Sequence, residues 1–289
     1  MRFVIIGDSK GKEGGINKKV LARILNKTDK LYPKPEFFVM LGDSVAGSRI
    51  PEILAAQLIM LRKLIERYHP NIPIIPVAGN HEVNVTSTDG RYEKILSEIY
   101  CDFTPDGILQ NYNRTVYYKD FSETRLIILN AFHYGKMHKI DKEQLDWLEQ
   151  AASANKKSKI VFVHSPAFPT GAHLGHCLDL YPACRDAFWN IIDKYRIDIV
   201  FSGHEHNYSR RIVNNSFNDG ENNFRNCVCQ VITGGGGEKL KSKYKSREGV
   251  IVPPIDKYHF VVVDIIAGTI DVSAISSEGK KMDQFKIVK

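Results

Sequence analysis

The chain has 289 residues, of which 43% are hydrophobic, and carries a formal net charge of +7 with a sequence pI near 9.0. This length and composition allow a substantial core. No apolar stretch approaches the roughly 20 residues that span a bilayer, and the start of the chain enters a strand at once, which leaves no room for a secretory signal. These features exclude a membrane-spanning protein, and we expect a soluble, cytoplasmic one.

The positive charge favours anionic partners. Nucleic acid is one candidate, but the basic residues are spread along the chain and no nucleic-acid-binding motif is present. A phosphate-bearing small molecule explains the excess as well, so we expect a small phosphorylated substrate; the oligomeric state stays open. The five cysteines have no zinc-knuckle spacing and are expected to be free thiols, with a Cys177–Cys184 disulfide as the weaker alternative.

The N-terminal part predicts alternating strands and helices. Apolar runs predict strands over 4–6, 37–41 and 74–77, and helical spacing of apolar residues predicts helices over 17–31 and 51–68. This order is typical of a largely parallel sheet.

The later part predicts a second set of strands, over 116–118, 126–129, 160–163 and 197–201, with a helix over 142–151, followed by strands over 228–232, 259–263 and 269–275. Stretches 83–113, 167–186, 208–226 and 234–255 lack strong periodicity. We expect them to be loops that form the walls of a cleft and determine substrate preference.

Five short polar blocks each follow an apolar run directly. Buried parallel strands would bring these blocks to one edge of a sheet. Asp, Asn and His together form a mixed nitrogen and oxygen ligand set, which suits Mn, Fe, Zn, Co or Ni better than Mg or Ca. The blocks therefore predict a metal site; they are Gly7-Asp8-Ser9, Gly42-Asp43-Ser44, Gly79-Asn80-His81-Glu82, His164-Ser165-Pro166 and Gly203-His204-Glu205-His206.

In this order, the blocks resemble those of the calcineurin-like metallophosphoesterase superfamily, and residues 203–210 and 233–237 resemble its purple-acid-phosphatase-like branch. The resemblance implies an α/β fold: a four-layer αββα sandwich of two mixed sheets flanked by helices, with metals at the carboxyl ends of strands. Because the blocks run from Asp8 to His206 without a linker between them, we expect residues 1–289 to form a single domain.

The resemblance also implies two transition metal ions, Mn, Fe, Zn or Ni. It assigns Asp8 and His206 to the first metal, Asp43 to a bridging position with a catalytic role, and Asn80, His164 and His204 to the second metal. His81 would be the general acid, since an imidazole can give a proton near neutral pH. The implied nucleophile is a metal-bound hydroxide that attacks the phosphate directly.

Two positions depart from the family pattern. Many members have His where this chain has Lys10, and the purple branch has Tyr where this chain has Ala46. An ammonium group is a poor ligand and alanine cannot coordinate. We therefore expect a weak or empty first site without tyrosinate-to-iron colour, and leave open whether Lys10 places positive charge near the phosphate or points to solvent.

Three further features lie near the blocks. Arg210, or Arg211, could reach a phosphate with its guanidinium, or belong to a solvated loop face. His173 and His176 lie in an expected cleft loop and are candidate substrate contacts. The glycine run 234–237 favours close backbone packing rather than nucleotide binding. The remaining histidines, His69, His133, His138 and His259, are expected at the surface or in the core.

The sequence thus predicts a metal-dependent phosphoesterase, with phosphomonoesters favoured. A phosphodiesterase acting on cyclic nucleotides or other diesters is the alternative within the enzyme class. A degenerate binding or scaffold protein is the alternative outside it, because Lys10 and Ala46 replace first-metal ligands. Retention of His81 argues against the scaffold.

Overall fold

The computed structural model describes residues 1–83, 90–217 and 224–289 and contains two mixed sheets. The first has six strands. In order across the sheet they are β15 (Lys281–Ile287), β14 (Thr269–Ser276), β13 (His259–Ile266), β1 (Arg2–Ile6), β3 (Phe37–Met40) and β4 (Ile74–Pro76). Strands β1, β3 and β4 run parallel, whereas β13, β14 and β15 form an antiparallel meander beside them.

The second sheet has eight strands. In order they are β12 (Val250–Ile255), β10 (Tyr208–Val213), β11 (Val228–Thr233), β9 (Ile199–Ser202), β8 (Ser158–Val163), β7 (Thr124–Leu129), β6 (Tyr117–Phe121) and β5 (Gly107–Ile108). Strands β7, β8, β9 and β11 are parallel to one another. A short strand, β2 (Lys10–Glu13), lies outside both sheets.

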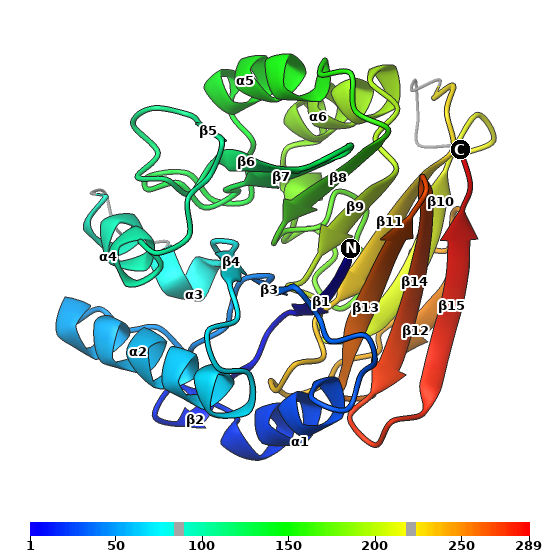
Figure 1. The fold of residues 1–289 in the computed structure, drawn as a ribbon. Helices are drawn as coiled ribbons and strands as arrows, with labels where there is room; N and C mark the ends of the chain where they lie inside the picture. Colours follow the sequence, from blue (N-terminus) through cyan, green and yellow to red (C-terminus); the bar gives the residue numbers. More distant parts are fainter. Residues whose placement is uncertain (84–89, 218–223) are drawn as a thin grey trace.

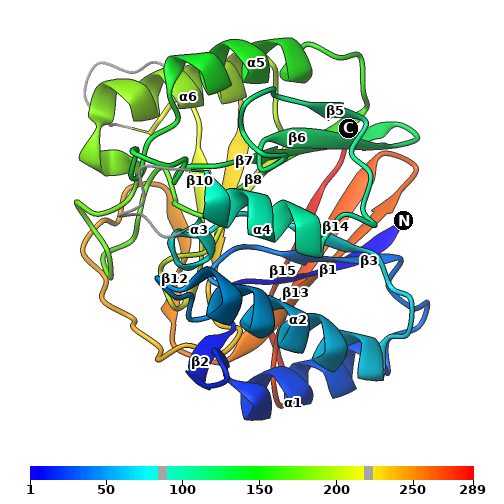
Figure 2. The same cartoon turned by 90° about the vertical axis from the view of Figure 1, so that its left-hand side faces the viewer.

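Helices cover the outer faces of both sheets (Figure 1). Helices α1 (Lys18–Thr28) and α2 (Pro51–Tyr68) lie outside the six-stranded sheet, and α5 (Lys142–Ala152) and α6 (Pro182–Lys194) outside the eight-stranded one. The short helices α3 (Asn80–Val83) and α4 (Arg91–Ile99) lie beside α2, and η1 (Leu178–Leu180) precedes α6 (Figure 2). The predicted αββα sandwich is therefore confirmed.

Alternating side chains on the strands build the layers. On β1, Phe3 and Ile5 pack between the sheets, while Val4 and Ile6 pack under the helices. Helix α1 buries an apolar stripe against this outer face, and the side chain of Asn17 caps its first turn by accepting the Val20 N–H.

Several predictions of irregular loops were wrong. Helix α4 lies within 83–113; the buried carboxylate of Glu93 interrupts its apolar stripe. Strand β10 lies within 208–226, where the charged pair Arg210 and Arg211 hides the strand pattern. Strand β12 lies within 234–255 and contains two prolines, which an edge strand tolerates because one side needs no donors.

Other expectations have clear outcomes. All five cysteines are free, as predicted, so the Cys177–Cys184 pair is absent. Within the described residues, no helix combines the length and the apolar character that crossing a bilayer requires.

Candidate metal centre

The polar blocks meet at the carboxyl ends of the parallel strands. The register aligns Ile6 with Met40 and Met40 with Pro76, so the residues that follow β1, β3 and β4 emerge at one edge. Asp8 and Asp43 have φ of 58° and 49°, a left-handed conformation that aspartate tolerates better than most residues. His204, which follows β9, has φ of 66°. Three site residues thus share a backbone conformation that recurs at functional sites.

Three buried polar atoms of this cluster have no hydrogen-bond partner: Asp8 Oδ1, Asn80 Oδ1 and His164 Nε2. His164 Nε2 lies 3.4 Å from Asp43 Oδ1 and 3.9 Å from Asp8 Oδ1. His206 Nε2 lies 3.5 Å from the same Asp8 oxygen. Buried polar atoms are almost always satisfied in native proteins, so these atoms indicate that a cation belongs among them.

The three histidines of the cluster are oriented by backbone carbonyl groups. His164 Nδ1 donates to Leu41 O at 2.8 Å and His206 Nδ1 to Lys239 O at 3.0 Å. His204 uses its other nitrogen, Nε2, toward His176 O at 3.1 Å. Each ring therefore turns its remaining nitrogen toward the carboxylates, which is the arrangement that fixes metal-binding histidines.

Burial and charge set the protonation of the cluster. Burial raises the pKa of Asp8 to about 7, and the neighbouring Asp43 carboxylate adds to this rise. Burial lowers the pKa of His164, but Asp43 and Asp8 outweigh it and raise the pKa to about 9. Burial lowers the pKa of His206 to about 3, so this imidazole is neutral and has a lone pair to donate.

Lys10 points into the cluster rather than to solvent. Its side chain is buried, and its ammonium group contacts Asp43 Oδ2. Burial lowers the pKa of Lys10, but the charges of Asp43 and Asp8 outweigh this and raise it, so the ammonium stays charged. A positive charge thus lies against Asp43 Oδ2, while His164 lies nearest the other oxygen, Oδ1.

The two predicted metal positions fit unequally. Asp43, His164 and His204 each offer a ligand atom, and these atoms all lie within 4.8 Å of one another. Across the described ranges of the chain, no comparable trio includes Asp8 and His206. The residues present therefore fit one cation well, and Lys10 competes for the other position.

His81 lies at the rim of the cluster. Its Nδ1 donates to Ala46 O at 2.6 Å, and its Nε2 lies 3.7 Å from Asp43 Oδ2. The side chain is 35% exposed. One ring nitrogen is fixed, and the other faces the space where a ligand would enter.

Two buried glutamates within the blocks organise the loops. Glu82 accepts hydrogen bonds from the backbone N–H groups of Gly79, Asp43, Ser44 and Val45. Glu205 does the same on the other side of the site and accepts from Thr170 N and Oγ1, Gly171 N and His173 N. Neither glutamate was predicted to have a role, although their positions within polar blocks are a signal that could have found them.

Two further histidines lie against the cluster. The ring of His173 lies 4.5 Å from that of His204 and 5.6 Å from that of His206, so the structure brings this predicted substrate contact to the site. His138, predicted at the surface or in the core, is buried with its ring 5.0 Å from that of His204. Burial lowers the pKa of both to about 4. His138 follows β7, as the blocks follow their strands, but eight residues separate it from the strand end.

The structure does not bring Arg210 to the cluster. Its guanidinium pairs with Asp283 on β15 at 2.7 Å and lies over the ring of Phe285. On β10, this side chain faces the six-stranded sheet rather than the blocks. Arg211 is buried and donates to Pro169 O and Ser246 Oγ. The predicted phosphate contact through Arg210 is therefore corrected.

The glycine run packs beside the site as predicted. A Cβ on Gly234 would lie 2.3 Å from Glu205 O and 2.8 Å from Asp8 Oδ2, and one on Gly236 would lie 2.5 Å from Gly7 O. Side chains at these positions would push the blocks apart.

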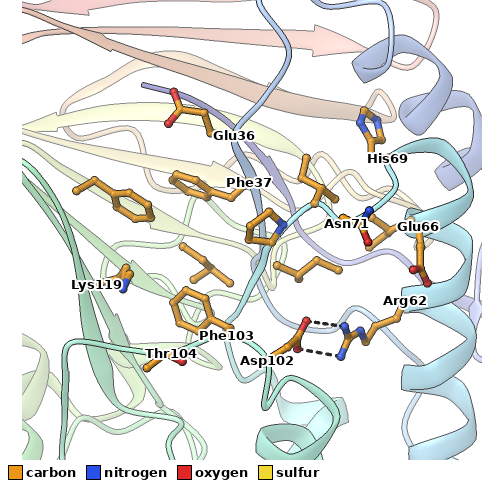
Figure 3. Close-up of a pocket in the computed structure, with 16 residues that line it drawn as sticks. Glu36, Phe37, Arg62, Glu66, His69, Asn71, Asp102, Phe103, Thr104 and Lys119 are labelled. Atoms are coloured by element: carbon orange, nitrogen blue, oxygen red, sulfur yellow. Dashed lines mark hydrogen bonds and ion pairs between the residues drawn. The ribbon is translucent and has the colours of Figure 1, made fainter.

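A cavity of about 590 Å³ lies at the opposite end of the strands (Figure 3). It is lined by Phe37 and Ile74, which begin β3 and β4, whereas the blocks follow the ends of these strands. Two residues that line it, Arg62 and Lys119, carry a positive charge, and both form ion pairs: Arg62 with Asp102 at 2.7 Å and Lys119 with Asp106 at 3.0 Å. This cavity therefore does not resemble a phosphate site.

The comparison with protein families agrees with this geometry. Residues 1–208 match the family model described as calcineurin-like phosphoesterase. The chain belongs to this family. Its members are metal-dependent phosphoester hydrolases, and the match covers every block from Asp8 to His206.

The chain is similar to known phosphatases of this family. It is 24% identical over 212 residues to the serine/threonine-protein phosphatase CPPED1 of Bos taurus, covering 69% of this chain and 62% of the relative. It is 27% identical over 163 residues to the Fe(3+)-Zn(2+) purple acid phosphatase 12 of Arabidopsis thaliana, covering 54% of this chain and 33% of that relative. The chain thus spans less than two thirds of either relative.

Solved structures share the fold. Purple acid phosphatase PPD1 from yellow lupin seeds superposes with a TM-score of 0.79 at 18% identity, covering 100% of this chain and 53% of that one. A dimetal phosphatase from Danio rerio superposes with a TM-score of 0.63 at 14% identity, covering 100% of this chain and 98% of that one. The predicted purple-acid-phosphatase-like resemblance is confirmed.

Proposed function

We propose that the chain is a metal-dependent phosphoester hydrolase, and that residues 1–289 act as one domain because both sheets contribute to the cluster. The observation that carries this proposal is the set of three unsatisfied buried atoms, Asp8 Oδ1, Asn80 Oδ1 and His164 Nε2, at the strand ends. The family match and the phosphatase relatives support it.

We assign the tighter metal position to Asp43, Asn80, His164 and His204. Asp8 and His206 would form a weaker position, because the ammonium of Lys10 already neutralises Asp43 from that side. A transition metal suits these ligands; Mn, Fe, Zn and Ni all remain candidates. With Ala46 in place of a tyrosine ligand, tyrosinate colour is not expected.

The chain's own residues supply the other parts of the reaction. A bound metal would supply Lewis acidity toward water and toward phosphate oxygens. Lys10 adds a fixed positive charge that needs no reorganisation as negative charge builds on the phosphate. His81, held by Ala46 O, would give its Nε2 proton to the leaving oxygen.

Phosphomonoesters are the favoured substrates, because the relatives named above are phosphatases and one is named for phosphoserine and phosphothreonine in proteins. Hydrolysis of diesters, cyclic nucleotides included, is the second candidate. A scaffold without activity is the third, motivated by Lys10 and Ala46.

The test combines metal analysis with hydrolysis. Protein purified without chelator is analysed for bound metal and assayed with p-nitrophenyl phosphate and its bis ester, with Mn, Ni, Zn or Fe added. We expect bound metal and faster hydrolysis of the monoester. His164→Ala should lose both metal and turnover, whereas Lys63→Ala, which removes an exposed side chain from α2, should lose neither. Metal without turnover on any ester would favour the scaffold.

A further inference from the structure

One surface segment beside the metal centre carries a row of cations. Residues 239–247 belong to no helix or strand, and every second residue is basic: Lys239, Lys241, Lys243, Lys245 and Arg247. All five side chains are exposed; of the four residues between them, Leu240, Tyr244 and Ser246 are half-buried and Ser242 is exposed. This alternation of exposure is that of an extended chain that presents one face to solvent. We call residues 239–247 the basic segment.

Hydrogen bonds tie the basic segment to the metal centre. Lys239 O accepts from His206 Nδ1 at 3.0 Å, and Lys241 N donates to His206 O at 2.9 Å. The Nζ atom of Lys241 lies 3.4 Å from His173 Nε2. The row of cations therefore begins at the rim of the cluster.

The segment then runs along the loop that Glu205 holds. Lys245 N and Ser246 N both donate to Thr170 O, at 2.9 and 3.0 Å. Thr170 is itself fixed by the Glu205 carboxylate. The positions of the cations relative to the metal centre are thus set by a hydrogen-bonded backbone rather than by a free loop.

None of the five cations forms an ion pair with another residue in the described part of the chain. Within residues 238–248, the two acids at the ends, Glu238 and Glu248, leave a surplus of three positive charges. Unpaired like charges in a row repel one another, and an anionic partner relieves this repulsion.

We propose that the basic segment binds acidic residues flanking the phosphorylated residue of a protein substrate; this inference rests on the proposed function. Alternate residues of an extended chain are about 6.5 to 7 Å apart, so cations at every second position match an extended acidic peptide. A single-stranded nucleic acid also carries a regular row of charges, but it needs aromatic faces for its bases. The one aromatic side chain of the segment, Tyr244, is half-buried and lies under the Arg247 guanidinium at 5.2 Å.

The experiment compares three phosphoserine peptides that differ only in flanking residues, acidic, neutral or basic, as substrates of the metal-loaded protein. We expect kcat/KM for the acidic peptide to exceed that for the neutral one by about tenfold, and the ratio to fall as ionic strength rises. The triple variant Lys243→Gln, Lys245→Gln, Arg247→Gln should bring the ratio close to one. The control triple variant Lys19→Gln, Lys30→Gln, Lys63→Gln has the same change in net charge and should keep the wild-type ratio. These exposed lysines lie on α1, in the turn after α1 and on α2, respectively.

The outcomes separate this inference from the proposed function. Equal rates on acidic and neutral peptides, with normal hydrolysis of p-nitrophenyl phosphate, would overturn the role of the basic segment alone. Absence of hydrolysis on every ester would overturn the proposed function instead. A 5′-phosphorylated single-stranded oligonucleotide serves as a competitor. If it competes more strongly than the acidic peptide, and loses this advantage in the first triple variant, the partner of the basic segment is nucleic acid and the acidic-peptide proposal is overturned.

Discussion

The ammonium group of Lys10 contacts Oδ2 of Asp43, while the other oxygen of the same carboxylate lies 3.4 Å from His164 Nε2. Asp43 therefore lies between a fixed cation on one side and ligand atoms without a hydrogen-bond partner on the other. A carboxylate that already neutralises one cation attracts a second one less strongly. We infer that this relationship limits how many metal ions the site can hold.

Replacing Lys10 with histidine should raise the number of bound metal ions. We expect about one metal ion per wild-type chain after dialysis and nearer two in Lys10→His, because an imidazole donates a lone pair where the ammonium repels the metal. Mass spectrometry of the metal content and calorimetric titration with Zn or Mn measure this directly. Lys12→His is the matched control, since Lys12 lies on the same short strand and is exposed. Two tightly bound ions in the wild type would contradict the prediction.

His81→Ala should separate catalysis from metal binding. We expect turnover of a phosphomonoester to fall by about 10²- to 10⁴-fold, the usual contribution of a general acid, with metal content unchanged. The reason is that His81 is held by the Ala46 carbonyl through Nδ1 and is not among the buried atoms without a partner that indicate metal ligands. The loss should be smaller for substrates whose leaving group needs no proton, such as p-nitrophenyl phosphate. Equal loss of metal and turnover would reassign His81 to metal binding.

The order of the polar blocks made the metal centre predictable. Each block follows a buried parallel strand, and parallel neighbours in one sheet bring their blocks to one edge. Asp8, Asp43 and Asn80 therefore gather at an edge of the six-stranded sheet, and His164 and His204 at an edge of the eight-stranded one. Only the family resemblance, not the strand pattern, predicted that the two edges meet. Helices α1, α2 and α5 were predictable for a different reason: the periodicity of their apolar residues is uninterrupted.

The directions of single side chains were not predictable. Arg210 was misplaced because residues 208–226 were expected to be a loop. In strand β10, which the structure places there, successive side chains point to opposite faces, and Arg210 pairs with Asp283 of the six-stranded sheet. Lys10 follows the first block by one residue, and sequence alone does not say whether it points to Asp43 or to solvent. His138 reaches the cluster through an irregular loop, which leaves no periodic signal.

Glu82→Ala should loosen the loop that carries Asp43. The Glu82 carboxylate satisfies four backbone N–H groups: those of Asp43 itself, of the next two residues, Ser44 and Val45, and of Gly79, which precedes Asn80. Leaving buried donors unpaired costs about 1 to 3 kcal/mol for each group, so the free energy of unfolding should fall by at least about 2 kcal/mol. Urea unfolding of the metal-free protein measures the loss, and metal affinity should fall in parallel. Glu66→Ala, which removes an exposed carboxylate from α2, is the control and should change neither quantity measurably.

Protonation of His259 should destabilise the fold in acid. His259 is buried on β13, its Nε2 hydrogen-bonds with Thr233 Oγ1 at 2.9 Å, and burial lowers its pKa from 6.5 to about 4. Below pH 6.5 the unfolded chain takes up a proton that the folded chain does not, so the stability that this residue contributes is present above that pH and is lost as pH falls toward 4. The expected loss between about pH 7.5 and about pH 4.5 is about 2 to 3 kcal/mol.

The measurement is urea unfolding of wild type and His259→Gln at both pH values, without metal. Because other buried histidines near the cluster also titrate, the informative quantity is the difference between the two proteins. We expect the variant to be less stable near neutral pH, where it loses packing, yet to lose less stability on acidification. His176→Gln, at an exposed position, should follow the wild type. An unchanged pH dependence in His259→Gln would mean that the folded protein accommodates a charged imidazole at this position and that burial does not lower its pKa.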